Sequence, residues 1–148
     1  HTNIRKVVTK MPKLYFYDFG IINMARESFA EMRFRPDIGN LIENFVFSEL
    51  IKGKPDYDKL YFFSTTSKTE IDFIYHFIDK EILPIEVKFK DMARPIIPKA
   101  LEEFCSQLKL KKAIILNKNL KSIYKKENTY YYFIPLLFTS KIKEFINV

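Results

Sequence analysis

The sequence predicts an α/β domain in which a mixed β-sheet is flanked by helices. Three strand-like segments follow one another without a helix between them, and an amphipathic helix and a further apolar strand come next. A clear helix precedes the whole group. A meander of three strands followed by a crossover helix and another strand combines antiparallel and parallel pairs. The 148 residues suit one domain with its own hydrophobic core.

The N-terminal part is expected to contain a strand and an irregular connection. Residues 13–25, KLYFYDFGIINMA, are predicted to open as a strand and to turn near Gly20. Residues 26–39 are predicted to be irregular or to form a short helix that ends at Pro36.

The clearest helix covers residues 37–53. Asp37 is a suitable N-cap, and Gly53 is a suitable C′ residue after the last turn. Apolar side chains recur at the helical period, at Ile38, Leu41, Ile42, Phe45, Val46 and Leu50.

The remaining elements alternate in the order that the fold class requires. Alternating apolar residues predict strands at 59–65, 70–78 and 82–90, and a helix is expected at 95–110, starting near Pro98. A buried strand at 111–118, an aromatic strand at 129–138 and a short closing helix at 140–147 complete the chain.

Charged side chains lie inside two of these strands, where charge is usually avoided. Side chains alternate between the two faces of a strand, so Glu86 and Lys88 share a face of segment 82–90. In segment 70–78, Asp72 lies on the face opposite to that of Ile71 and Phe73. The register of the hairpin decides whether Asp72 joins Glu86.

Two hairpin loops are compatible with the sequence. A two-residue loop at Asp79 and Lys80 pairs Asp72 with Val87 and separates the two carboxylates, whereas a loop at residues 78–80 sets Asp72 opposite Glu86. We favour the three-residue loop because the shorter one lacks the Asn-Gly or Asp-Gly that it prefers. The longer loop also makes one face consistently apolar, although a β-bulge would alter the faces.

Two carboxylates facing each other across a hairpin repel, and a cation relieves the repulsion. Carboxylate oxygens are the ligands that Mg²⁺ prefers, with water and substrate phosphate completing its shell. Lys88 is placed to orient an attacking water or to stabilise charge on a phosphate. Glu43 lies at the edge of the core-facing stripe of helix 37–53 and is expected to lean over the sheet. The alternative is an exposed strand face on which Glu86 and Lys88 are solvated charges.

Three blocks in this order, LIENFVFSEL, EIDFI and IEVK, resemble the PD-(D/E)xK nuclease superfamily. With KLYFYDFGI at the start, the blocks look like the C-terminal domain of a family of archaeal and bacterial AAA-type ATPases, over residues 13–120. The resemblance implies a restriction-endonuclease-like α-β-β-β-α-β core and phosphodiester cleavage with Mg²⁺ or Mn²⁺. It implies Glu43, Asp72 and Glu86 as metal-site acids and Lys88 as the catalytic lysine. Ile71 replaces the proline that usually precedes the aspartate.

The expected organisation is one nuclease-like domain, residues 1–148, as the C-terminal fragment of a longer ATPase. The chain itself contains no G-x-x-x-x-G-K-[ST] motif. The resemblance makes the ATPase portion of the polypeptide a partner, and DNA is compatible with the net charge of +7. Cys105 is the sole cysteine and no apolar run is long enough to span a membrane, so a cytoplasmic protein is expected.

Two other functional interpretations remain open. The domain could be a non-catalytic module that binds DNA or protein and regulates the ATPase, or an oligomerisation domain that uses the aromatic segment 129–138. His76 shares the charged face of its strand, but a structural or exposed histidine is the more frequent case. Cys105 is expected to be a buried structural thiol.

Overall fold

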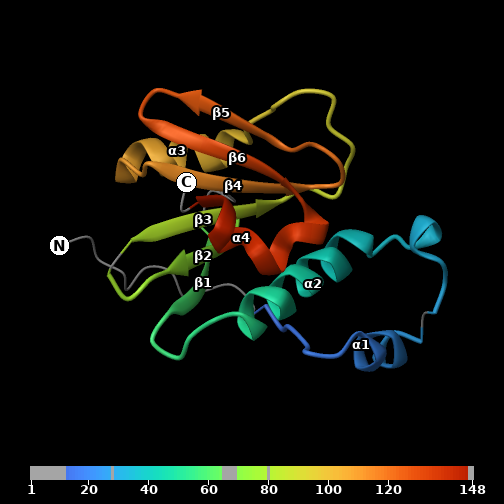
Figure 1. The fold of residues 1–148 in the computed structure, drawn as a ribbon. Coiled ribbons are helices and arrows are strands. Elements are labelled where there is room, and N and C mark those ends of the chain that lie inside the picture. The colour runs from blue at the N-terminus through green and yellow to red at the C-terminus, as the bar shows by residue number, and fades with distance from the viewer. Residues whose placement is uncertain (1–12, 28, 65–69, 80, 147–148) are drawn as a thin grey trace.

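The computed structural model describes residues 13–27, 29–64, 70–79 and 81–146. Its centre is a six-stranded sheet in the order β1-β2-β3-β4-β6-β5 (Figure 1). The strands are β1 Lys59–Ser64, β2 Glu70–His76, β3 Ile82–Val87, β4 Lys112–Asn117, β5 Ser122–Lys126 and β6 Thr129–Pro135. The β3–β4 and β4–β6 pairs are parallel and the other pairs are antiparallel. The predicted mixed-sheet α/β fold is therefore confirmed.

Helices cover both faces of this sheet, and each face buries its own apolar cluster. Helices α2 Ile38–Lys52 and α4 Ile142–Ile146, with the 3₁₀ helix η3 Leu136–Lys141, pack on one face around Val46, Phe73 and Ile85. Helix α3 Lys99–Leu108 packs on the other face around Leu101 and Ile115. Figure 1 shows α2 and α4 on the same side of the strands, with α3 on the opposite side.

The predicted meander and crossover are present at nearly the predicted bounds. Helix α3 begins directly after Pro98, and it connects β3 to its parallel neighbour β4. Burial in the second cluster raises the pKa of the Cys105 thiol to about 12, as expected for a structural cysteine. No helix in the part of the chain that the structure describes is long and apolar enough to cross a membrane.

The register of the β2–β3 hairpin agrees with the three-residue loop. Phe73 pairs with Ile85 and His76 with Ile82, which is the register that the three-residue loop requires. Continued by one residue, this register would set Asp72 opposite Glu86. The pairing continues into the loop, where the Phe77 amide donates to the Glu81 carbonyl at 3.0 Å. Of the three predicted loop residues, Lys80 lies outside the described residues.

A β-bulge in β2 overturns one prediction about the faces of the sheet. Tyr61 of β1 pairs with Ile74 and Phe63 pairs with Ile71, so two residues of β2 lie opposite the single Phe62. The bulge breaks the alternation between the faces. Ile71 therefore packs in the α3-side cluster and Phe73 in the α2-side cluster, and the prediction that they share a face is wrong.

The predicted N-terminal strand is also wrong. Residues 13–17 are extended but belong to no strand, and the chain then forms helix α1 Phe19–Ala25 and the 3₁₀ helix η2 Met32–Phe34. The Asn44 side chain of α2 explains the difference, because it satisfies the backbone that a neighbouring strand would otherwise pair with. The Phe16 amide donates to Asn44 Oδ1, and Asn44 Nδ2 donates to the Phe16 carbonyl, both at 2.7 Å.

The ends of α2 are at the predicted positions, but both terminal residues act differently. Asp37 precedes the helix without a side-chain capping hydrogen bond, because its carboxylate accepts from Arg26 and Arg35 instead. Gly53 follows the helix with φ −90°, outside the left-handed conformation that favours glycine after a helix.

The sequence analysis missed strand β5 and made the following strand too long. The residues of β5 are mostly exposed, so they lack the alternation that predicts a strand. Strand β6 ends at Pro135, and residues 131–136 are buried between the two helical layers. The middle of the aromatic segment is therefore part of the core, whereas Tyr130, Leu137 and Phe138 near its ends are exposed.

We predict that Asn44→Ala lowers the free energy of unfolding by about 1–3 kcal/mol, because it leaves the Phe16 amide and carbonyl without their partner. Asn40→Ala, at an exposed position of the same helix, is the matched control and should change stability by less than about 0.5 kcal/mol. Urea unfolding followed by circular dichroism measures both. Equal effects of the two substitutions would show that the side-chain clamp on Phe16 contributes nothing.

Candidate functional site

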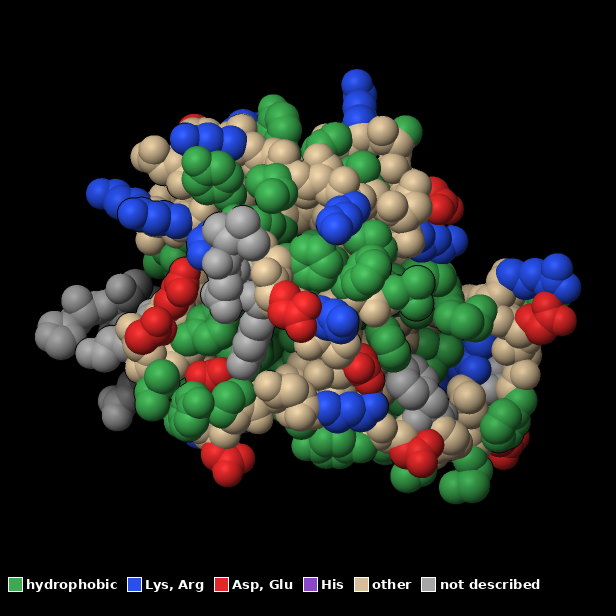
Figure 2. All heavy atoms as spheres, viewed as in Figure 1, with side chains coloured by type: hydrophobic (Ala, Val, Ile, Leu, Met, Phe, Trp, Pro, Cys, Tyr) green, Lys and Arg blue, Asp and Glu red, His purple; other side chains and the backbone are tan. Residues whose placement is uncertain are grey.

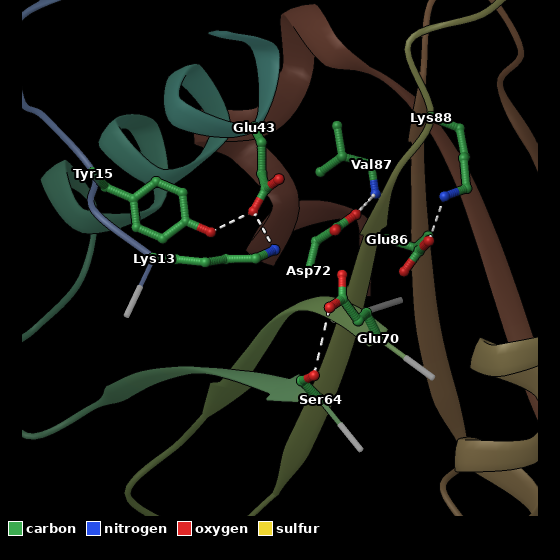
Figure 3. Close-up of polar contacts among 9 residues, drawn as sticks. All are labelled: Lys13, Tyr15, Glu43, Ser64, Glu70, Asp72, Glu86, Val87 and Lys88. Atoms are coloured by element: carbon green, nitrogen blue, oxygen red, sulfur yellow. Dashed lines mark hydrogen bonds and ion pairs between the residues drawn. The ribbon is translucent and has the colours of Figure 1, made fainter. Parts of the chain in front are cut away.

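The site begins where the β2–β3 ladder ends. The last pair of the ladder on this side is Phe73 with Ile85, and Asp72 lies in the bulge just beyond it. Its carboxylate points across to the neighbouring strand, where Asp72 Oδ2 accepts the Val87 amide at 2.8 Å (Figure 3). This contact holds Asp72 against the end of β3, next to Glu86.

Glu86 is buried within the sheet, with 5% of its surface exposed. Its Oε1 lies 2.5 Å from the ammonium of Lys88, which follows β3 directly. Its Oε2 has no hydrogen-bond partner, and it is the one buried side-chain oxygen or nitrogen among the described residues in that condition. An unsatisfied buried acceptor costs about 1–3 kcal/mol, so this oxygen is available to accept a hydrogen bond or to bind a cation.

The electrostatics of the site follow from burial and from like charges. Burial and the neighbouring Glu86 carboxylate, with a smaller contribution from Glu43, raise the pKa of Asp72 to about 7. Burial opposes the charged form of Lys88, but its hydrogen bond to Glu86 and the nearby carboxylates outweigh this effect and raise its pKa. Lys88 is therefore a protonated ammonium at neutral pH, able to donate hydrogen bonds but not to accept a proton.

Glu43 reaches toward this site from α2, as predicted, but other side chains hold it. Its Oε1 accepts from the Lys13 ammonium at 2.8 Å and from the Tyr15 hydroxyl (Figure 3). Both partners come from the extended segment 13–17. The structure thus brings Asp72, Glu86 and Lys88 together, with Glu43 beside them as the anchor of that segment.

The sequence analysis gave Lys13, Tyr15 and Glu70 no part in the site. Glu70 accepts a hydrogen bond from Ser64 and, with Asp72, contributes to the raised pKa of Lys13. The block KLYFYDFGI contributes to the family resemblance, but its sequence does not indicate that it lies against α2. His76 pairs with Ile82 at the far end of β2, and its ring is nearly perpendicular to that of Tyr61, so it stays outside the site.

The residues fit a divalent cation held by two carboxylates. Among the described residues, no three histidine, cysteine or acidic side chains are arranged closely enough to form a complete metal site. Asp72 and Glu86 nevertheless offer hard oxygen ligands, including the unpartnered Glu86 Oε2, and Mg²⁺ is commonly bound through one or two carboxylates with water in its other positions. The two acids would hold the metal, while Glu43 is engaged by Lys13 and Tyr15.

Comparison with known proteins gives a family and a related fold. The family described as "Domain of unknown function (DUF4143)" matches residues 38–137, which include Glu43, Asp72, Glu86 and Lys88. No curated protein matches the chain.

Among solved structures, the chain is similar to one from the tetradecameric assembly of Thermococcus gammatolerans McrB AAA+ hexamers with bound McrC. The TM-score is 0.54 at 10% identity, and the match covers 66% of this chain and 28% of the other. At that identity the likeness concerns the fold, and the present chain spans less than a third of the protein it matches.

The raised pKa of Asp72 predicts that the metal-free domain loses stability as the pH rises. Folded Asp72 holds its proton up to about pH 7, whereas the unfolded carboxyl loses it near 3.8. The stabilisation that comes from protonated Asp72 is therefore complete below pH 3.8, the pKa of the unfolded carboxyl. It is lost as the pH rises to the folded pKa of about 7, by up to about 1.4 kcal/mol per pH unit.

Asp72→Asn should abolish this part of the pH dependence, and the exposed Asp56→Asn should not. Urea unfolding in EDTA at several values between about pH 4.5 and 8 measures the difference between each variant and the unsubstituted chain. If the stability difference between Asp72→Asn and the unsubstituted chain were constant across that range, it would contradict the raised pKa of Asp72.

Proposed function

We propose that this chain, which belongs to the DUF4143 family of domains of unknown function, is a nuclease-like domain that hydrolyses phosphodiesters with Mg²⁺ or Mn²⁺ and works with an AAA-type ATPase. In this proposal it forms the C-terminal part of a longer ATPase polypeptide. Asp72 and Glu86 hold the metal, Lys88 acts on water or phosphate, and Glu43 organises the edge of the site.

One observation carries the proposal. Glu86 is buried and Asp72 is partly buried on the neighbouring strand. Asp72 accepts the Val87 amide and Glu86 Oε1 pairs with Lys88, whereas Glu86 Oε2 has no partner. Burying charge without compensation is expensive, and proteins retain such arrangements chiefly at functional sites. A dication between these acids would supply the missing charge. The PD-(D/E)xK resemblance assigns the same residues independently.

The chemistry follows from the protonation states. A bound divalent cation would polarise the phosphodiester and neutralise charge that develops on its oxygens. Lys88 donates a hydrogen bond to the attacking water or to a phosphate oxygen, since its ammonium has no lone pair. Water adds to phosphorus, the bond to the leaving oxygen breaks, and the proton lost by water passes to a carboxylate or to solvent. The products are a phosphate monoester and an alcohol.

Lysines beside Lys88 support DNA as the substrate. Lys90 is exposed just beyond Lys88, and its carbonyl accepts the Lys118 amide at 3.2 Å, so the backbones of these lysines lie together at the carboxyl ends of parallel strands β3 and β4. The Lys118 ammonium lies over the Phe89 ring and 3.7 Å from the Asp91 carboxylate. Lysine ammonium groups bind backbone phosphates without regard to sequence. On the face drawn in Figure 2, basic and acidic side chains are interspersed among apolar ones. Because the charges on that face are mixed, we assign phosphate binding to the lysines beside Asp72 and Glu86, which are Lys88 and Lys90.

An ATPase partner is supported by a different surface. Large apolar side chains are exposed around α1 and η2: Leu14, Tyr17, Ile21, Met24, Phe29, Met32 and Phe34. Extended exposed apolar surfaces commonly mark protein interaction sites. This surface also favours the second candidate function, a non-catalytic module that attaches DNA or protein to the ATPase.

We predict that the purified chain nicks or cuts plasmid DNA with Mn²⁺ or Mg²⁺ and is inactive in EDTA. Glu86→Gln keeps the shape of the side chain but removes the charged metal ligand, and Lys88→Ala removes the hydrogen-bond donor to water or phosphate. Each should lower the cleavage rate at least about 100-fold. Glu103→Gln, on the exposed part of α3, is the matched control and should cut normally. Gel electrophoresis of supercoiled plasmid measures the rate, and undiminished cutting by Lys88→Ala would refute the proposed role of this site.

Thermal melts of the unsubstituted chain and of Asp72→Asn, with Mg²⁺ and with EDTA, test whether these acids bind a metal. For a dissociation constant of about 1 mM, about 10 mM Mg²⁺ stabilises the fold by roughly 1.4 kcal/mol, which corresponds to about 3–6 °C in Tm. Asp72→Asn should lose most of this rise at constant ionic strength. A metal-independent Tm together with retained DNA binding would favour the non-catalytic module.

A further inference from the structure

The extended segment 13–17 packs against α2 beside the acidic site. Asn44 makes two hydrogen bonds to the backbone of Phe16, and the Tyr15 ring stacks on Phe47 with 4.5 Å between ring centroids. Tyr15 also contacts the ring of Phe73 from the core beneath. These contacts fix the positions from which Lys13 and Tyr15 extend toward Glu43.

The Lys13 ammonium lies among several carboxylates. It is 2.8 Å from Glu43 Oε1, with 30% of the lysine side chain and 17% of the glutamate side chain exposed. Figure 3 shows the same ammonium directed toward the region between Glu43 and Asp72. Asp72 and Glu70 also favour its charged form. Lys13 thus stands on one flank of the acids and Lys88 on the other.

We propose that Lys13 is a resident cation of the acidic site, held there by segment 13–17, which keeps Glu43 from acting as a metal ligand and limits the site to one divalent cation on Asp72 and Glu86. The part that concerns metal binding rests on the proposed function. The pairing of Lys13 with Glu43 does not, so the two parts can fail separately.

Charge and hydrogen bonding give the reason. Glu43 Oε1 already accepts from two donors, Lys13 and Tyr15, so recruiting Glu43 to a metal requires that these contacts be given up. The positive charge of Lys13 also repels a second cation near Asp72. Lys13 is therefore a positioning residue, which sets the charge of the site and the number of its available ligands.

The first test is a double-substitution cycle without metal. Lys13→Met and Glu43→Gln should each lower Tm by about 2–4 °C. The Tm of the double variant should be no lower than that of the less stable single variant. Glu49 and Lys52 form an ion pair on the same helix with 62% of the lysine side chain exposed, and the cycle of Lys52→Met with Glu49→Gln is the matched control with little coupling. Additive effects of Lys13→Met and Glu43→Gln would overturn the inference.

The second test measures how many Mn²⁺ ions bind and how tightly, from the electron paramagnetic resonance signal of the free ion. The unsubstituted chain and Lys13→Arg should bind one Mn²⁺ alike. Lys13→Met should bind at least about threefold more tightly, because a repelling charge is gone and Glu43 is released. Adding Glu43→Gln to Lys13→Met should abolish that gain.

Unchanged or weaker Mn²⁺ binding by a folded Lys13→Met protein would overturn the restraint on Glu43. If no variant binds Mn²⁺ while the metal-free cycle shows coupling, Lys13 keeps its place as the resident cation and the proposed metal-dependent function fails instead.

Discussion

The acceptance of the Val87 amide by the Asp72 carboxylate is the contact on which the candidate site depends. A bulge in β2 displaces Asp72 from regular alternation, and this hydrogen bond fixes its carboxylate against β3 beside Glu86. Without the bulge, Ile71 and Phe73 would belong to the same face. With it, each enters a different core cluster, so the same local irregularity supports both layers of packing and presents an acid to the neighbouring strand.

The acids are stabilised incompletely, and this is what distinguishes them from an ordinary ion pair. Lys88 neutralises one oxygen of Glu86, but the other oxygen has no partner and the partly buried Asp72 lies nearby. Removing both charges would relieve the fold of their desolvation, because buried ion pairs rarely contribute more stability than a well-packed apolar pair. Their presence agrees with the general observation that proteins depart from good local packing and pairing at functional positions.

The segment before α2 links the edge of the domain to the acids. Asn44 replaces a neighbouring strand as hydrogen-bond partner of Phe16, and Glu43, the preceding residue of α2, receives Lys13 and Tyr15. Adjacent residues of one helix turn thus hold the backbone of the segment and its charged side chain. The exposed apolar residues around α1 follow directly, so a partner that covers them would bind beside the segment that carries Lys13.

Hydrophobic periodicity in the sequence determined the meander, the long helix α2 and the crossover to a parallel strand, and the loop preference determined the register of the β2–β3 hairpin as far as Phe73 and Ile85. These features depend on neighbours in the chain or on the alternation of buried side chains, which a sequence displays directly. The tertiary structure alone decided the bulge, the exposed edge strand β5 and the partners of Glu43. Each of these depends on contacts between distant segments: β1 against β2, β5 against β6, and residues 13–17 against α2. An extended segment that pairs with a side chain has the same local pattern as a strand, and only packing against α2 distinguishes the two.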